Sequence, residues 1–96
     1  MHAVMRSYTG SGSKEFFDLL EQRKSEVESL MRAVKGFVSY SLVRSADGGF
    51  SVTINQDKAG ADESQKVARD WVKQHASSTG IGSPKVSEGS VITHFK

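Results

Sequence analysis

The chain contains no cysteine, a single proline and no long run of apolar side chains. The absence of cysteine excludes disulfide bonds and metal sites built from thiolates. No stretch approaches the roughly 18 consecutive apolar residues that a membrane-spanning helix needs. The first residues also lack the apolar core of a secretory signal. These absences predict a cytoplasmic protein that has no membrane partner.

Neither sign of charge dominates the chain, because 13 lysines and arginines stand against 11 acidic residues. The longest basic cluster, Arg23-Lys24, lies between Glu21 and Glu26, whereas nucleic-acid-binding domains gather their basic side chains on one face. The three histidines are far apart in the sequence and match no metal-binding spacing. The sequence therefore predicts no nucleic-acid partner, no metal site and no bound cofactor.

Alternating and helical patterns of apolar residues divide the chain into six elements of one domain, residues 1–96. Strands are predicted at 2–9, 37–44, 50–56 and 86–95, and helices at 14–34 and after a loop that Gly60 opens. Asp47-Gly48-Gly49 predicts a hairpin turn, because glycine accepts positive φ at no steric cost. The order β-α-β-β-α-β predicts a ferredoxin-like α+β fold, in which a four-stranded antiparallel sheet carries both helices on one face.

One face of this sheet would be uncovered in a single copy of the domain. The hairpin is predicted to have an apolar face, with Phe50, Val52 and Ile54, and a hydroxyl-rich face. A chain of this length buries only a small core, so apolar residues on an uncovered sheet are costly. Pairing with the sheet of a second copy is the simplest cover, and we expect a homodimer.

Two side chains of the second helix are candidates for a functional site. His75 falls on the apolar stripe that also contains Trp71, so both are predicted to point toward the sheet. A histidine there can act as a general acid or base or ligate a metal. Alternatively, it can be a core residue bonded to a backbone carbonyl, or a residue at the helix end that faces solvent. Trp71 can form a wall for a flat aromatic ligand, or it can simply fill the core.

Polar residues of the strands are further candidates. Arg6 and Tyr8 share one face of the strand 2–9, because side chains alternate along a strand. If this face lies under the helices, both residues can converge with Tyr40 and His75 on one pocket. If it is the other face, Arg6 forms an ion pair at the dimer interface, for example with Glu88. The sequence leaves both arrangements open.

Four motifs of the chain resemble those of the dimeric α/β-barrel superfamily, in particular the small stand-alone proteins similar to antibiotic-biosynthesis monooxygenases. The motifs extend over nearly the whole chain, and they are Arg6-x-Tyr8-x-Gly10, Gly36-Phe37-x-x-Tyr40, Ala68-x-x-Trp71-Val72 and Glu88-Gly89-x-Val91. The resemblance implies a ferredoxin-like domain that pairs into a dimeric α/β barrel. The superfamily includes cofactor-free quinone-forming monooxygenases, haem-degrading monooxygenases, isomerases and proteins whose role is unassigned.

The haem-degrading branch can be tested against this sequence. Its members rely on an asparagine in the first strand, a tryptophan on the second helix and a histidine well downstream. Trp71 matches, but the strand 2–9 has no asparagine and His75 follows Trp71 by only one turn. These two departures argue against haem degradation.

The resemblance implies a leading hypothesis, which is a cofactor-free monooxygenase-like enzyme that acts on a small aromatic or quinone-like molecule between the sheet and the helices. In this hypothesis Arg6 pairs with a carboxylate or oxyanion of the ligand, and His75 is the catalytic acid or base. The ligand-binding residues are Tyr8, Tyr40 and Trp71. The alternative is a non-catalytic dimeric module that binds a ligand or serves a structural or regulatory role.

Overall fold

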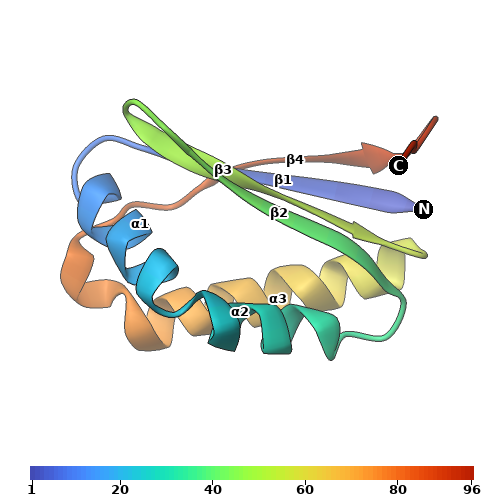
Figure 1. Cartoon of the computed structure of the whole chain (residues 1–96), viewed down its shortest axis with the longest axis horizontal. Helices are drawn as coiled ribbons and strands as arrows, with labels where there is room; N and C mark the ends of the chain where they lie inside the picture. Colours follow the sequence, from blue (N-terminus) through green and yellow to red (C-terminus); the bar gives the residue numbers. More distant parts are fainter.

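The computed structural model describes residues 1–96, and Figure 1 shows a sheet with all helices on one side. In chain order the elements are β1 (His2–Thr9), α1 (Ser13–Gln22), α2 (Lys24–Arg32), β2 (Phe37–Ser45), β3 (Gly48–Asn55), α3 (Lys58–His75), the short 3-10 helix η1 (Ser77–Thr79) and β4 (Lys85–Ser90). The predicted ferredoxin-like α+β fold is confirmed, except that the first predicted helix is divided into two.

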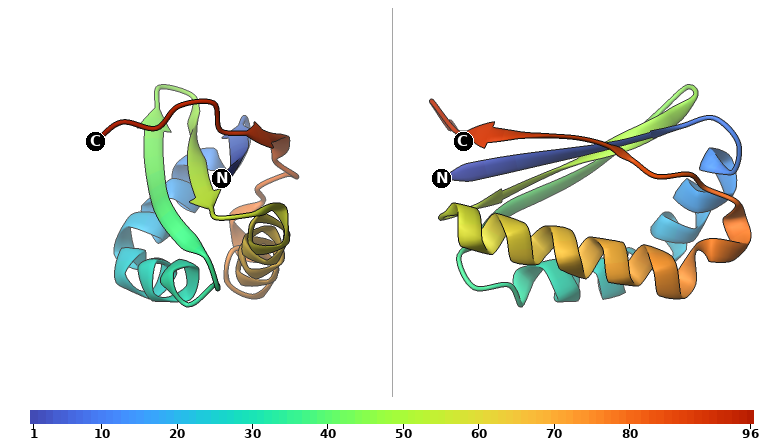
Figure 2. Two further views of the ribbon diagram at one scale, coloured as in Figure 1. Left: turned by 90° about the vertical axis from the view of Figure 1, so that its right-hand side faces the viewer. Right: turned by 180° about the vertical axis from the view of Figure 1, so that it is seen from behind.

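The sheet has the strand order β2-β3-β1-β4, and every neighbouring pair is antiparallel. The central strand β1 places Arg6 opposite Ser51 of β3 and opposite Val86 of β4. Opposite residues point to the same face of a sheet. Because Val4, Arg6 and Tyr8 are buried, this face lies under the helices. The views in Figure 2 show no helix on the other face.

The first predicted helix, 14–34, is interrupted at Arg23, so the prediction of a single helix is wrong. Arg23 has a φ of −112° and a ψ of 23°, which are not helical values. Its N–H donates to the Leu19 carbonyl oxygen at 3.0 Å, and its own carbonyl accepts from the Val27 N–H at 3.1 Å. Arg23 falls in line with the apolar positions of the helix, and the break keeps its charged head from being buried. After the break α2 buries only Met31.

The second predicted helix begins earlier than expected, at Lys58, and Gly60 is a helical residue and not part of a loop. Asp57 caps this helix, because its carboxylate accepts a hydrogen bond from the Gly60 N–H at 2.8 Å. A side chain at position 60 would come within 2.9 Å of the Lys35 carbonyl oxygen. This glycine therefore reflects the close approach of two segments, where only a residue without a side chain fits.

The last strand is shorter than predicted, because β4 ends at Ser90 and not near residue 95. The Val91 N–H still donates to the Met1 carbonyl oxygen at 3.0 Å. The following segment leaves the sheet (Figure 2), and Ile92 and Phe95 are 95% and 89% exposed. The apolar residues after Ser90, which led to the prediction of a longer strand, therefore pack against nothing within one copy of the chain.

The β2–β3 hairpin does not separate apolar from hydroxyl side chains, so this prediction is also wrong. Tyr40 lies opposite Thr53, and Ser41 lies opposite Val52. Each face of the hairpin therefore carries residues of both kinds. The register comes from the turn at Asp47 and from an irregular pairing at the start of β2, and a shift of one residue exchanges the two faces. As a result, the hydroxyl of Thr53 lies under the helices.

The hydrophobic core is concentrated at the end of the molecule where α1 lies under the sheet (Figure 1). Its buried members are Tyr8, Phe16, Phe17, Leu20, Trp71 and Ala76. The rings of Tyr8 and Phe16 lie 4.6 Å apart in a tilted arrangement, which favours an aromatic pair. The other half of the layer, beside α2, receives only Met31 as a fully buried side chain from that helix.

Candidate functional site

A cavity of about 50 Å³ lies between the sheet and the helices. Arg6, Tyr8, Tyr40 and Trp71 all line it, so the structure brings together four of the five predicted site residues. A cavity of this size holds a few water molecules, since one water needs roughly 10–15 Å³. Ligand pockets usually measure roughly 300–1,000 Å³. An aromatic ligand can therefore enter only if neighbouring side chains move.

Arg6 carries a charge into this cavity without an acidic partner. The residue is 6% exposed. Its guanidinium donates from Nη2 to the Tyr8 hydroxyl oxygen at 3.0 Å and from Nη1 to Gln65 Oε1 at 3.4 Å. Arg6 takes part in none of the ion pairs of the chain. Arg6 thus faces the helices rather than the open face, and it retains donors for a further acceptor.

The two tyrosines place hydroxyl groups near this cation. Tyr8 is 6% exposed and accepts from Arg6, while Tyr40 reaches the same cavity from β2. Burial raises the pKa of Tyr40 to about 12, and the charge of an ionised Tyr8 hydroxyl adds to this rise, whereas the Arg6 charge and a hydrogen bond with Ser51 oppose it. At neutral pH Tyr40 is therefore a neutral phenol, which can donate a hydrogen bond to an anionic oxygen but cannot serve as a base.

Ionisation of Tyr40 is expected to weaken the fold between pH 10 and pH 12. Since the pKa is 10.0 for an ordinary tyrosine and about 12 here, the unfolded chain loses this proton first, and stability that is present below pH 10 is lost as the pH rises toward 12. Two pKa units correspond to roughly 2–3 kcal/mol. Urea unfolding of the wild type and of Tyr40→Phe across this range measures the effect. Equal losses in both proteins would show that Tyr40 ionises as freely in the folded chain as in the unfolded chain.

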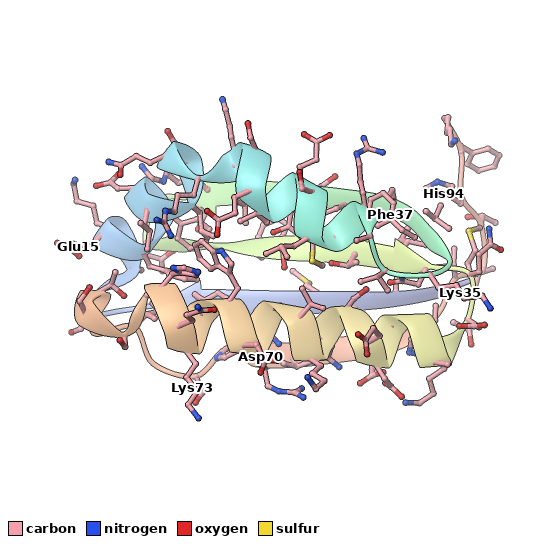
Figure 3. All side chains as sticks on the ribbon, turned by 90° about the horizontal axis from the view of Figure 1, so that it is seen from below. Glu15, Lys35, Phe37, Asp70, Lys73 and His94 are labelled. Atoms are coloured by element: carbon pink, nitrogen blue, oxygen red, sulfur yellow. The ribbon has the colours of Figure 1, made fainter.

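Trp71 closes the cavity on the side of α3. It is 6% exposed, and its indole Nε1 donates to Glu26 Oε2 of α2 at 2.8 Å. Figure 3, a view from below, shows α2 and α3 side by side in front of the sheet, and we call the line between them the α2–α3 seam. Leu30, Val67 and Trp71 line both the cavity and an outer groove of about 380 Å³ along this seam. Trp71 is therefore a wall residue between the interior and the surface.

His75 lies outside the cavity, in the outer groove. The Arg23 guanidinium lies 2.8 Å from His75 Nδ1, and Glu26 Oε2 lies 3.6 Å from His75 Nε2. Its ring also packs against Trp71, with 5.1 Å between the ring centroids. The expectation that His75 shares a pocket with Arg6 is therefore not met in this arrangement of the helices. Its role as an acid or base stays a prediction.

Several cavity residues were not among the predicted site residues, namely Ser51, Thr53, Ser64 and Gln65. The two strand residues escaped because the hairpin pattern was interpreted with its faces separated. Gln65 escaped because a glutamine near a helix start fits a common capping pattern, whereas the cap of α3 is Asp57. The signal that could have found it is helical spacing, since Gln65 precedes Ala68 by three residues and Val72 by seven, which places it on the same face as this apolar stripe.

A second outer groove, of about 460 Å³, lies between α2 and β2. It shares Leu20 of α1 and Val27 and Met31 of α2 with the inner cavity, so these side chains lie between the cavity and this groove. No group of three or more histidine, aspartate or glutamate side chains is close enough to hold a metal ion. No helix is both long enough and apolar enough to cross a membrane.

Solved structures with the same arrangement of elements were found by comparison, although neither the family models nor the curated protein sequences match this chain. A monooxygenase of Streptomyces coelicolor, solved with nanaomycin D, is 18% identical, with 99% of this chain and 90% of that chain covered and a TM-score of 0.69. The haem degrader MhuD of Mycobacterium tuberculosis, solved with two haems, is 15% identical, with 99% and 98% covered and a TM-score of 0.66.

A dimeric ferredoxin-like protein from an uncultured marine organism is also similar, at 13% identity, with 99% of this chain and 95% of that chain covered and a TM-score of 0.67. At identities this low the likeness concerns the fold and leaves substrate and reaction open. The chain therefore has the ferredoxin-like α/β fold of the antibiotic-biosynthesis-monooxygenase-like proteins.

Proposed function

We propose that the chain is a homodimeric, monooxygenase-like protein that binds a small aromatic or quinone-like molecule between its sheet and its helices. An anionic oxygen of that molecule accepts a hydrogen bond from the Arg6 guanidinium. The observation that carries the proposal is the buried guanidinium of Arg6, which faces a cavity and has no acidic partner. Two proteins of the same fold have been solved with a ligand, nanaomycin D in one and haem in the other.

The electrostatics of the cavity favour an anion. A buried cation without a counter-charge is costly, and an anionic oxygen that replaces cavity water offsets this cost. Arg6 is fixed by the Tyr8 hydroxyl at 3.0 Å, so little freedom is lost when a ligand binds. Tyr40 can donate a second hydrogen bond, because its raised pKa keeps the phenol protonated. The aromatic walls, Tyr8 and Trp71, suit a planar ring.

Entry of such a ligand requires α2 to move. This helix buries only Met31, and its link to α1 is the break at Arg23, so a small shift disturbs little of the core. The bond from Trp71 to Glu26 is one tie that has to open along the α2–α3 seam. When the seam opens, His75 on its rim comes within reach of an entering ligand. His75 can therefore act as the acid or base only after the α2–α3 seam has opened.

The test uses two small planar probes that differ in charge, 4-nitrophenolate and 4-nitroaniline, at a pH where the phenol is ionised. The wild type is expected to bind the phenolate more tightly, by about tenfold or more, because only the anion gains a charge-assisted bond to Arg6. Trp71 is the single tryptophan, so its quenched fluorescence reports binding from the cavity wall. Arg6→Met should lose this preference. Its matched control is Arg69→Met, which changes an exposed arginine on α3, the helix of Trp71, and should bind like the wild type.

Equal affinity for both probes, or no binding of either, would remove the basis of the proposal. Oxygen uptake then separates an enzyme from a binding module. In a monooxygenase reaction with phenol, one oxygen atom of O₂ replaces the para hydrogen of the ring and the other leaves as water, so that phenol and O₂ give 1,4-benzoquinone and H₂O. Uptake above the rate without protein supports the enzyme. Binding without uptake supports the non-catalytic module, which the position of His75 outside the cavity also favours.

The homodimer in this proposal forms through the open face of the sheet. Met5 and Val43 on this face are 37% and 40% exposed in a single copy. Ile92 and Phe95, beyond β4, are almost fully exposed. Apolar groups gathered in this way are characteristic of an interface, and a two-fold axis lets one surface cover its own copy. A protein of the same fold is described as dimeric.

Val52→Glu is expected to convert a dimer of the 10.5 kDa chain into a monomer, because it buries a charge in the middle of the paired sheets. The matched change is Val86→Glu, on the helix-facing side of β4, which should leave the dimer intact. Light scattering during size-exclusion chromatography gives the mass of each protein. A wild type that elutes as a monomer at all accessible concentrations would refute the dimer.

A further inference from the structure

Gln65 lies between the buried cation of the site and a carboxylate at the surface. Its Oε1 accepts from Arg6 Nη1 at 3.4 Å, and its Nε2 donates to Glu88 Oε2 at 3.3 Å. The other carboxylate oxygen of Glu88 is held by His2 Nε2 at 2.8 Å, and Lys58 Nζ lies 3.9 Å from it. The amide side chain of Gln65 thus links the two charges through neutral groups and keeps them from meeting.

The sheet register would otherwise favour a direct ion pair. In the β1–β4 ladder Arg6 lies opposite Val86, and the next residue pair on the same face is Val4 with Glu88. Arg6 and Glu88 are therefore diagonal neighbours, a spacing that long side chains can bridge. A pair formed there would neutralise the guanidinium that faces the cavity. In the structure this contact is replaced by two hydrogen bonds to Gln65.

We propose that Gln65 is a positioning residue that sets the charge preference of the site, because it separates Arg6 from Glu88 and so leaves the Arg6 charge available to an anionic ligand. This inference rests on the proposed function and extends it. It assigns selectivity between anionic and neutral ligands to a residue of α3 that carries no charge. Gln65 need not touch the ligand for this role, since it acts through Arg6.

The first variant, Gln65→Glu, places a carboxylate where an amide oxygen now accepts from Arg6. Binding of 4-nitrophenolate is expected to weaken by about tenfold or more, because the cation is neutralised. Binding of 4-nitroaniline should change less than about threefold, since it gains no charge-assisted bond. The matched control is Gln56→Glu, which makes the same change at an exposed position outside the cavity and should leave both affinities unchanged.

A second pair of variants separates charge from shape. Gln65→Met keeps the length of the side chain but removes both hydrogen bonds, so Arg6 is expected to turn to Glu88 and the preference for the phenolate should fall. Adding Glu88→Gln to Gln65→Met removes the competing carboxylate and should restore most of that preference. Gln65 is half-buried and both partners of the pair are polar, so these variants are expected to fold, which circular dichroism checks.

The outcomes distinguish this inference from the proposed function. If the wild type prefers the phenolate but Gln65→Glu keeps the same preference, the role of Gln65 is wrong and the site stands. A preference lost in Gln65→Met and not restored by Glu88→Gln also overturns it, because Gln65 would then act only through packing. If the wild type binds neither probe, the proposed function fails and takes this inference with it.

Discussion

Arg6→Met is expected to stabilise the folded chain by about 1–2 kcal/mol while it abolishes the preference for an anionic ligand. Replacing buried charges by apolar side chains of similar volume is often neutral or stabilising by roughly 1–4 kcal/mol. Part of this gain is lost, because the Tyr8 hydroxyl and Gln65 each lose a hydrogen bond with Arg6. A protein that retains such a charge at a cost in stability uses it for something other than folding.

The measurement is urea unfolding followed by circular dichroism, together with the two-probe titration for each protein. Arg69→Met is the control, and its stability should lie within about 0.5 kcal/mol of the wild type, because Arg69 is exposed. Arg6→Lys keeps the charge and should retain much of the anion preference. If Arg6→Met destabilises the chain by about 2 kcal/mol or more, Arg6 is a structural link between Tyr8 and Gln65 and is not retained for a ligand.

Phe16→Ala is expected to lower the free energy of unfolding by about 3–5 kcal/mol, the range for a fully buried phenylalanine. Phe16 is 1% exposed, and its ring lies 4.6 Å from the ring of Tyr8 and 5.4 Å from that of Phe17. It is also the largest side chain that is fully buried in the chain. Small domains have little stability to lose, so this change is expected to leave a substantial unfolded fraction at room temperature.

Phe16→Leu provides the graded comparison, because it leaves a smaller void and should cost distinctly less. Thermal and urea unfolding of the three proteins give the series. The same series tests the position of the cavity, since Phe16 lines it. A loss below about 1.5 kcal/mol for Phe16→Ala would mean that the site collapses easily and that the aromatic core is looser than the ring distances indicate.

The element order could be predicted because it depends on local signals. Alternating side chains mark β1, and the two glycines after Asp47 mark the hairpin. The placement of Arg6 and Tyr8 in one cavity also follows from their spacing of two residues on a strand, once that face lies under the helices. The choice between the two faces was not local. It depends on which side α1 and α3 cover, and the pattern of a central strand does not contain this information.

The wrong predictions for His75 and Gly60 have a common cause. Both depend on where a segment distant in the sequence lies. Helical periodicity predicted that His75 points toward the sheet, but His75 is the last residue of α3 and lies in the outer groove beside the break at Arg23. The periodicity of a helix says which side is buried and not how far along its axis the partner extends. The glycine at position 60 was misinterpreted for the same reason, since the neighbour that requires it is Lys35.

Gln65 is the clearest case of a residue that sequence reasoning could not assign. Its two partners are Arg6 and Glu88, which are 59 and 23 residues away. A glutamine near a helix start fits a common capping pattern, so local spacing gives no reason to place it in a site. Its actual contacts arise only when β1 and β4 lie side by side and α3 crosses beneath them.

The position of β1 in the sheet also has a consequence for how the chain folds. β1 precedes the other strands in the chain, yet its two neighbours are β3 and β4, and the pairing of His2 with Ser90 joins residues 88 positions apart. Closing such a loop costs entropy before any contact repays it, so pairings of this kind slow folding. Until β4 is made, one edge of the central strand is free to pair with another chain. We therefore expect the steps that assemble Arg6, Gln65 and Glu88 to be among the last in folding, so that the site is complete only when the sheet is.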